Sequence, residues 1–115
     1  MKSAETHFQI QEELLLAKQS RKEGNEGRAR VCARRAAGAA VGSYLTRQGV
    51  ANKTDNAYLS LQTLGRMGNF PDRIQIAIDR LIQRVDEKHQ LPPEIDLIHE
   101  AGILIQFLEI GKTEN

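Results

Sequence analysis

The sequence predicts an all-α fold, an up-and-down four-helix bundle with one additional short helix, formed by a single domain over residues 1–115. Three observations predict this fold class. Apolar residues recur every three or four positions, which is the period of a helix and not of a strand. Clusters of glycine and proline divide the chain into five pieces that are joined by short connections. The length of 115 residues suits one domain with its own core.

The first two predicted helices cover residues 3–22 and 26–48. Ser3 is the predicted N-cap of the first helix, and Glu5 then lies in its first turn. The second helix is the longest, about 34 Å at 1.5 Å per residue. Because the connections between helices are short, we expect neighbouring helices to pack antiparallel.

The other three predicted helices cover residues 55–67, 72–90 and 93–110. The third is the short one, and Thr54 or Asp55 is its predicted cap. The fourth begins directly after Pro71. The fifth begins at Pro93, has acidic residues in its first turn and ends before Gly111. Both late helices are rich in β-branched residues, but their apolar period still favours helices.

The helix at 26–48 has apolar residues on two nearly opposite faces. One face has small side chains that let another helix approach closely, namely Ala29, Cys32, Ala33, Ala36, Ala40 and Ser43. The second face is a stripe of four residues, Val31, Gly38, Gly42 and Leu45. Each glycine costs about 1 kcal/mol of helix stability relative to alanine, so the pair suggests close backbone contact. We predict a homodimer interface along this stripe, with another helix of the same chain as the alternative partner.

The same helix has four arginines within eight residues, Arg28, Arg30, Arg34 and Arg35. They are candidates for binding the phosphates of a nucleic acid or nucleotide, because a guanidinium group matches two phosphate oxygens at once. Residues 18–35 hold seven basic and two acidic residues, whereas residues 86–115 hold seven acidic and two basic ones. The alternative is therefore that the arginines extend along the bundle and pair with acidic residues of the last helices.

The run Gly27-Arg-Ala-Arg-Val-Cys-Ala-Arg-Arg-Ala-Ala-Gly38, followed by Tyr44-Leu45, resembles the alanine-rich second helix of HEPN-like helical-bundle domains. The later order is also similar, with a short helix that contains Leu64, a helix after Pro71, and then Pro93 followed by Asp96, Glu100, Ala101 and Leu104. The similarity spans roughly residues 12–108. It implies a bundle of four or five helices that is often dimeric. The family is found beside nucleotidyltransferases and in RNA-targeting systems.

Ribonucleases of that family carry an arginine followed four to six residues later by a histidine, and Arg84 and His89 have this spacing. The resemblance implies His89 as general acid or base and Arg84 as the group that stabilises charge on the phosphate. Asp86 and Glu87 lie between them and would repel an RNA backbone. A basic residue in the last turn of a helix is also expected from the helix dipole alone.

Composition excludes several classes of protein. The single cysteine, Cys32, excludes a disulfide framework and a cysteine-built zinc site, and we predict neither a metal nor a cofactor. No apolar run approaches the roughly 18 residues that cross a bilayer, and no signal peptide opens the chain, so we predict a cytoplasmic protein without membrane contact. Aromatic residues make up only 4%, which argues against nucleic-acid binding on stacking platforms.

The predicted function is that of a non-catalytic interaction module that forms a homodimer. It is expected to bind a partner protein, such as a nucleotidyltransferase, or RNA or a nucleotide. One alternative is a metal-independent ribonuclease that uses Arg84 and His89. The other is a purely structural bundle whose arginines are all paired within the chain.

Overall fold

The computed structural model describes residues 2–51, 54, 56–83 and 95–113 of the chain. Over these residues it has the helices α1 (Lys2–Lys22), α2 (Glu26–Arg47), α3 (Ala57–Met67), α4 (Asp72–Ile82) and α5 (Leu97–Thr113). The described residues contain no strand. The all-α helical bundle predicted from the sequence is thus confirmed. No helix in the described ranges is both long and apolar enough to cross a membrane.

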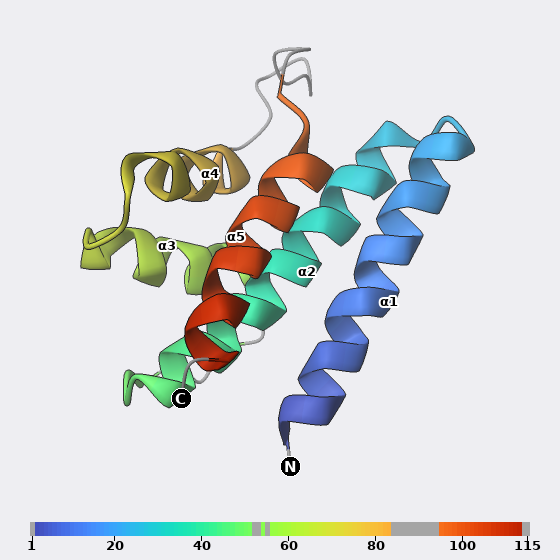
Figure 1. Cartoon of the computed structure of the whole chain (residues 1–115). Helices are drawn as coiled ribbons and strands as arrows, with labels where there is room; N and C mark the ends of the chain where they lie inside the picture. The colour runs from blue at the N-terminus through green and yellow to red at the C-terminus, as the bar shows by residue number, and fades with distance from the viewer. Residues whose placement is uncertain (1, 52–53, 55, 84–94, 114–115) are drawn as a thin grey trace.

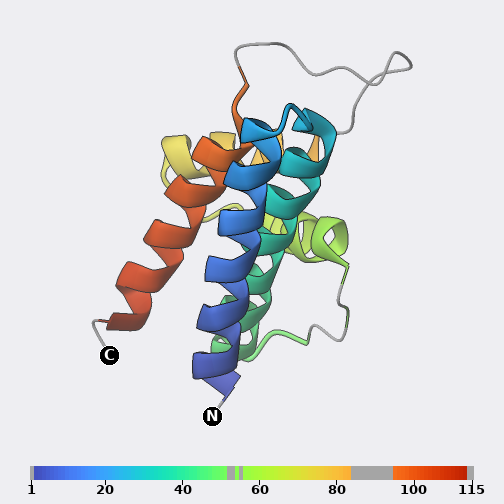
Figure 2. The ribbon, with the colours of Figure 1, turned by 90° about the vertical axis from the view of Figure 1, so that its right-hand side faces the viewer.

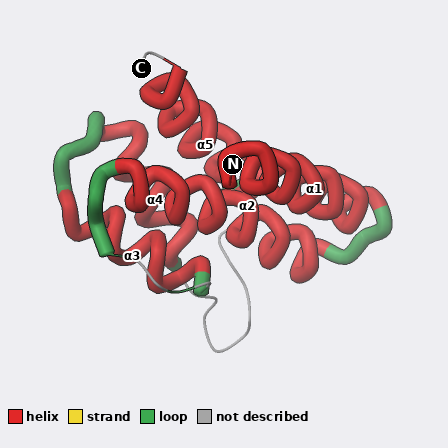
Figure 3. The backbone as a smooth tube through the Cα atoms, turned by 90° about the horizontal axis from the view of Figure 1, so that it is seen from below, coloured by secondary structure: helices red, strands yellow, loops and turns green. Residues whose placement is uncertain are grey.

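Helix α2 lies at the centre of the bundle and contacts α1, α3 and α5 (Figure 1). Helix α1 begins and α5 ends at the same end of the bundle, so these two helices run in opposite directions (Figure 2). The short helices α3 and α4 pack on each other and run across the long helices, on the side of α2 away from α1 (Figures 1 and 3). The bundle is therefore three long helices with a crossing pair of short ones.

Local hydrogen bonds set the starts of α2 and α3. The Asn25 side chain accepts a hydrogen bond from the Arg28 N–H at 3.0 Å and caps α2. The Asn56 side chain accepts one from the Leu59 N–H at 3.1 Å and caps α3, so the cap is neither Thr54 nor Asp55. A short polar side chain at this position replaces a helical hydrogen bond that the first turn lacks.

The acidic side chain of Asp96 fixes the start of α5. Its Oδ1 accepts hydrogen bonds from the N–H groups of Ile98 at 3.1 Å and His99 at 3.2 Å. Helix α5 consequently begins at Leu97, four residues later than predicted, and Asp96 is its cap rather than part of its first turn. The helix also continues to Thr113, beyond the predicted end before Gly111.

Two other predicted boundaries differ from the structure. Helix α1 begins at Lys2, so Ser3 lies inside the helix and is not its N-cap. Helix α4 ends at Ile82, because the backbone of Gln83 leaves the helical region with ψ 125°, whereas the sequence pattern predicted a helix to residue 90. The described residues therefore include two short helices of 11 residues, α3 and α4, where one was expected.

Two ion-pair clusters join helices that are distant in sequence. Glu100 of α5 is only 2% exposed and is reached by Arg73 at 2.9 Å and Arg80 at 2.7 Å, both from α4. Arg21 of α1 pairs with Glu26 at 2.7 Å and with Asp96 at 3.0 Å. The first cluster links α4 to α5, and the second links the α1–α2 turn to the start of α5.

Candidate functional site

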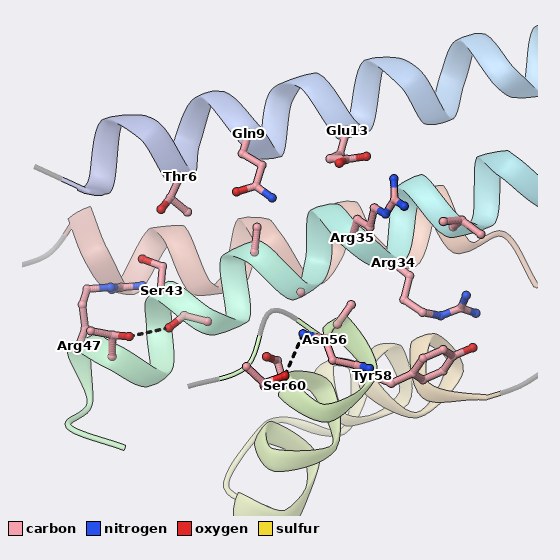
Figure 4. Close-up of a pocket in the computed structure, with 17 residues that line it drawn as sticks. Thr6, Gln9, Glu13, Arg34, Arg35, Ser43, Arg47, Asn56, Tyr58 and Ser60 are labelled. Atoms are coloured by element: carbon pink, nitrogen blue, oxygen red, sulfur yellow. Dashed lines mark hydrogen bonds between the residues drawn. The ribbon is translucent and has the colours of Figure 1, made fainter. Parts of the chain in front are cut away.

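A groove of about 1010 Å³ runs along α2 between α1 and the start of α3 (Figure 4). We call it the α2 groove. Helix α1 contributes Thr6, Gln9 and Glu13 to its lining. Helix α2 contributes Val31, Arg34, Arg35, Gly38, Ala39, Gly42, Ser43, Thr46 and Arg47. The third wall consists of Thr54, Asn56, Ala57, Tyr58 and Ser60.

The groove exists because the side chains of α2 along this side are small. Gly38, Ala39, Gly42 and Ser43 leave space that larger residues would fill. A Cβ atom at Gly38 would lie 2.7 Å from Ala57 Cβ and 2.9 Å from Ala57 Cα, closer than atoms can pack. The start of α3 therefore rests directly on the backbone of α2. This contact brings the polar residues Asn56 and Tyr58 to the groove wall.

Arg34 lines the groove but is held by contacts with other helices of the chain. It is only 8% exposed, and its Nε donates a 2.8 Å hydrogen bond to the backbone oxygen of Leu81 in α4. Its guanidinium carbon also lies 4.7 Å from the centre of the Tyr58 ring. Arg34 thus joins α2 to α4 and to α3, which fixes the wall that Tyr58 forms.

Arg35 and Arg47 are the exposed arginines of the groove. They are twelve residues apart on α2, which corresponds to about 18 Å along the helix axis. Neither forms an ion pair with a residue that the structure describes, although the Arg47 guanidinium lies 5.7 Å from the centre of the Tyr44 ring. Their charges are therefore accessible from the groove.

Glu13 faces α2 from the opposite wall, near Arg35 (Figure 4). Its Oε1 atom is buried and has no hydrogen-bond partner in the described part of the chain. The thiol of Cys32 is 2% exposed. Its pKa is raised by burial, then by the charge of the Glu13 carboxylate and by a hydrogen bond with it, against the opposing charges of Arg35 and Arg28. A buried thiol with a raised pKa is a poor nucleophile.

The structure does not gather the four predicted phosphate-binding arginines in one place. Arg34 and Arg35 line the α2 groove, whereas Arg28 and Arg30 are not among its lining residues. Arg30 instead lies near Glu26 and helps to lower the pKa of that carboxyl, after the hydrogen bond from Arg21.

The predicted dimer stripe is divided between the groove and the core. Val31, Gly38 and Gly42 line the groove, and Val31 is 43% exposed, whereas Leu45 is fully buried within the chain. Gly38 and Leu45 thus have neighbours in the same chain. For these two residues the structure agrees with the alternative stated above, in which another helix of the same chain covers the stripe. The homodimer remains a prediction, and sedimentation of the wild type and of a Gly42→Leu variant tests it.

The predicted catalytic pair, Arg84 and His89, lies outside the described residues. The ribonuclease activity therefore remains a prediction. RNA cleavage by the wild type and by His89→Ala tests it, and equal or absent activity in both proteins contradicts it.

Sequence reasoning missed most of the polar residues of the groove, among them Glu13, Arg47, Asn56 and Tyr58. Asn56 had a detectable signal, since asparagine is a strong N-cap residue and a helix was expected to begin nearby. Arg47 belongs to the same helix as Arg35, so its position along the axis could be calculated. Glu13 had no clear signal, because the inward face of α1 is poorly marked by apolar residues.

No group of three or more His, Cys, Asp or Glu side chains in the described ranges is arranged to hold a metal ion. No protein-family model, curated protein or solved structure matches the chain.

Proposed function

We propose that this chain is a non-catalytic binding module whose α2 groove receives the phosphate groups of RNA or of a nucleotide. The observation that carries the proposal is the presence of Arg35 and Arg47 in one groove without ion-pair partners among the described residues. Three arginines and one glutamate line the groove, so its charge favours an anion. On sequence resemblance alone, we further propose that the module is a HEPN-like bundle.

The chemistry of the groove suits phosphate. Guanidinium groups form paired, charge-assisted hydrogen bonds with phosphate oxygens, and such bonds are stronger than neutral ones. Helix α3 begins at the groove wall, where the positive end of its dipole adds to the attraction of anions. Two arginines about 18 Å apart would contact separate phosphates of an extended strand. A mononucleotide would contact only one of them.

The test is binding of a labelled single-stranded RNA, followed by fluorescence anisotropy at increasing salt, with a mononucleotide as competitor. The double variant Arg35→Gln/Arg47→Gln removes both groove charges. Lys18→Gln/Arg66→Gln is the matched control, because it changes the net charge equally at two exposed positions outside the groove.

We expect the groove variant to bind RNA about tenfold more weakly or worse, and the control to bind close to the wild-type affinity. The slope of log affinity against log salt should decrease by about 1.4 in the groove variant, because two phosphate contacts are lost. Equal binding by the two double variants, or no binding of RNA and nucleotide at low salt, overturns the proposal. Strong competition by the mononucleotide identifies a nucleotide rather than a strand as the ligand.

A further inference from the structure

We infer that the α2 groove binds single-stranded RNA at two points, and that the shortest strand which reaches both points has four nucleotides. This inference rests on the proposed function and specifies its ligand as a strand rather than a free nucleotide. The two points are Arg35 and Arg47, which lie twelve residues apart on α2, about 18 Å along its axis (Figure 4). Neither guanidinium forms an ion pair with a residue that the structure describes.

The separation of the two arginines sets the length of the ligand. Stacked nucleotides advance about 3.4 Å per step along a strand, and an unstacked strand extends to about twice that distance. Two steps of an extended strand therefore cover about 14 Å, and three steps cover about 20 Å. Three is thus the smallest number of steps that spans the two arginines, and three steps connect the phosphates of four nucleotides. A shorter strand contacts one arginine at a time.

The part of the groove between the two arginines leaves room for such a strand. Ala39 and Gly42 lie about one and two turns after Arg35, and Ser43 lies about one turn before Arg47. These three residues have small side chains or none, so the path along α2 is open. The groove volume of about 1010 Å³ is at the upper end of the range for pockets that hold one small molecule. A basic groove that follows the backbone is also how proteins bind single strands of varied sequence.

Two contacts on one strand strengthen each other. When one phosphate is bound at Arg35, the nucleotides that follow act as a linker that holds another phosphate near Arg47. The second contact is then intramolecular. It is absent when the linker is too short, and it contributes most when the length of the linker matches the distance. The affinity should therefore rise in one step at the length that spans the two arginines, and not by an equal factor for each added nucleotide.

The experiment measures the binding of 5′-phosphorylated oligouridylates of one to six nucleotides by calorimetry. It compares the wild type with the single variants Arg35→Gln and Arg47→Gln. Lys18→Gln is the matched control, because it removes one positive charge at an exposed residue outside the groove. Thermal melting verifies that the three variants are folded.

We expect the wild type to bind the tetranucleotide about tenfold more tightly than the trinucleotide, because the second contact is then made. Each groove variant should lose this step, since its strand has one contact at every length, and Lys18→Gln should keep it. The slope of log affinity against log salt should be larger by about 0.7 for the tetranucleotide than for the dinucleotide in the wild type. The two slopes should be equal in each groove variant.

Three results contradict the two-point contact. They are an affinity that rises evenly with length, equal binding of the mononucleotide and the tetranucleotide by the wild type, and a step that persists in either groove variant. Each overturns this inference and leaves the proposal of a phosphate-binding groove intact. Absence of all nucleotide and RNA binding overturns both.

Discussion

Two acidic residues that face the inside of the bundle have opposite surroundings. Glu100, between α4 and α5, is held by Arg73 at 2.9 Å and Arg80 at 2.7 Å. Glu13, in the α2 groove, forms no ion pair with a residue that the structure describes, although Arg35 lines the same groove. The difference indicates that charges at the α4–α5 contact hold helices together. At the α2 groove, by contrast, Arg35 and Glu13 form no ion pair with any residue that the structure describes.

The largest effect is expected from removing the buried charge at the α4–α5 contact. Glu100→Gln leaves Arg73 and Arg80 without their shared partner, so we expect a loss of about 3 kcal/mol in the free energy of unfolding. This value is at the lower end for buried pairs, because both arginines are partly exposed. Urea unfolding measures it. A loss below about 1 kcal/mol would show that the contact depends on packing rather than on charge.

A smaller effect is expected where the groove meets α3. Gly38→Ala places a methyl group against Ala57, so α3 must shift, and we expect a net loss of about 1 kcal/mol. Gly102→Ala is the matched control, since a Cβ there has no neighbour within 4 Å. This control should gain up to about 1 kcal/mol from helix propensity. Urea unfolding of both variants gives the comparison, and equal stability would contradict the close contact of α2 with α3.

The pH dependence of stability separates the two carboxylates further. Burial acts to raise the pKa of Glu100, but the hydrogen bonds from Arg73 and Arg80 outweigh it, and the pKa is lowered. A carboxyl whose pKa is lower in the folded state stabilises the protein above its unfolded pKa, and this contribution is lost as the pH falls through the folded pKa. We expect the stability gap between the wild type and Glu100→Gln to narrow below about pH 4. Unfolding curves from pH 7 to pH 3 measure the gap, and a constant gap would contradict the ion pairs.

The smallest effect on stability is expected at Glu13. Glu13→Gln removes a carboxylate that forms no ion pair with a residue that the structure describes, and the amide oxygen can still accept from the Cys32 thiol, so we expect the free energy of unfolding to change by less than about 1 kcal/mol. The change is to be measured under the same conditions as for Glu100→Gln. A loss as large as that of Glu100→Gln would show that Glu13 is a structural residue, and the contrast between the two sites would then disappear.

The sequence predicted the helices well where the apolar spacing is regular and a strong cap is present. The central position of α2 followed from its small residues, since Ala33, Ala36 and Gly38 allow close neighbours on several sides. The end of α4 and the start of α5 were misplaced. Pro93 is a favourable first residue of a helix, but the Asp96 carboxylate caps the chain three residues later.

The site was harder to predict than the fold, because it depends on tertiary contacts. The arginines of α2 were recognised from composition, but sequence alone did not separate Arg34, which bonds to Leu81 of a distant helix, from Arg35, which lines the groove. Phe8 and Leu15 interrupted the pattern of α1, since both are apolar and both are exposed. The position of Glu13 on the inward face of α1 could therefore not be predicted from the apolar pattern.

The two tyrosines of the chain each lie under an arginine of the groove, Tyr58 under Arg34 and Tyr44 under Arg47. Because the chain has no tryptophan and phenylalanine emits only weakly, these two rings dominate its intrinsic ultraviolet emission. A ligand that draws the Arg47 guanidinium away from Tyr44 would change the environment of one of the two tyrosines. Under the proposed function, Tyr44 is therefore an unlabelled optical reporter of ligand binding in the groove.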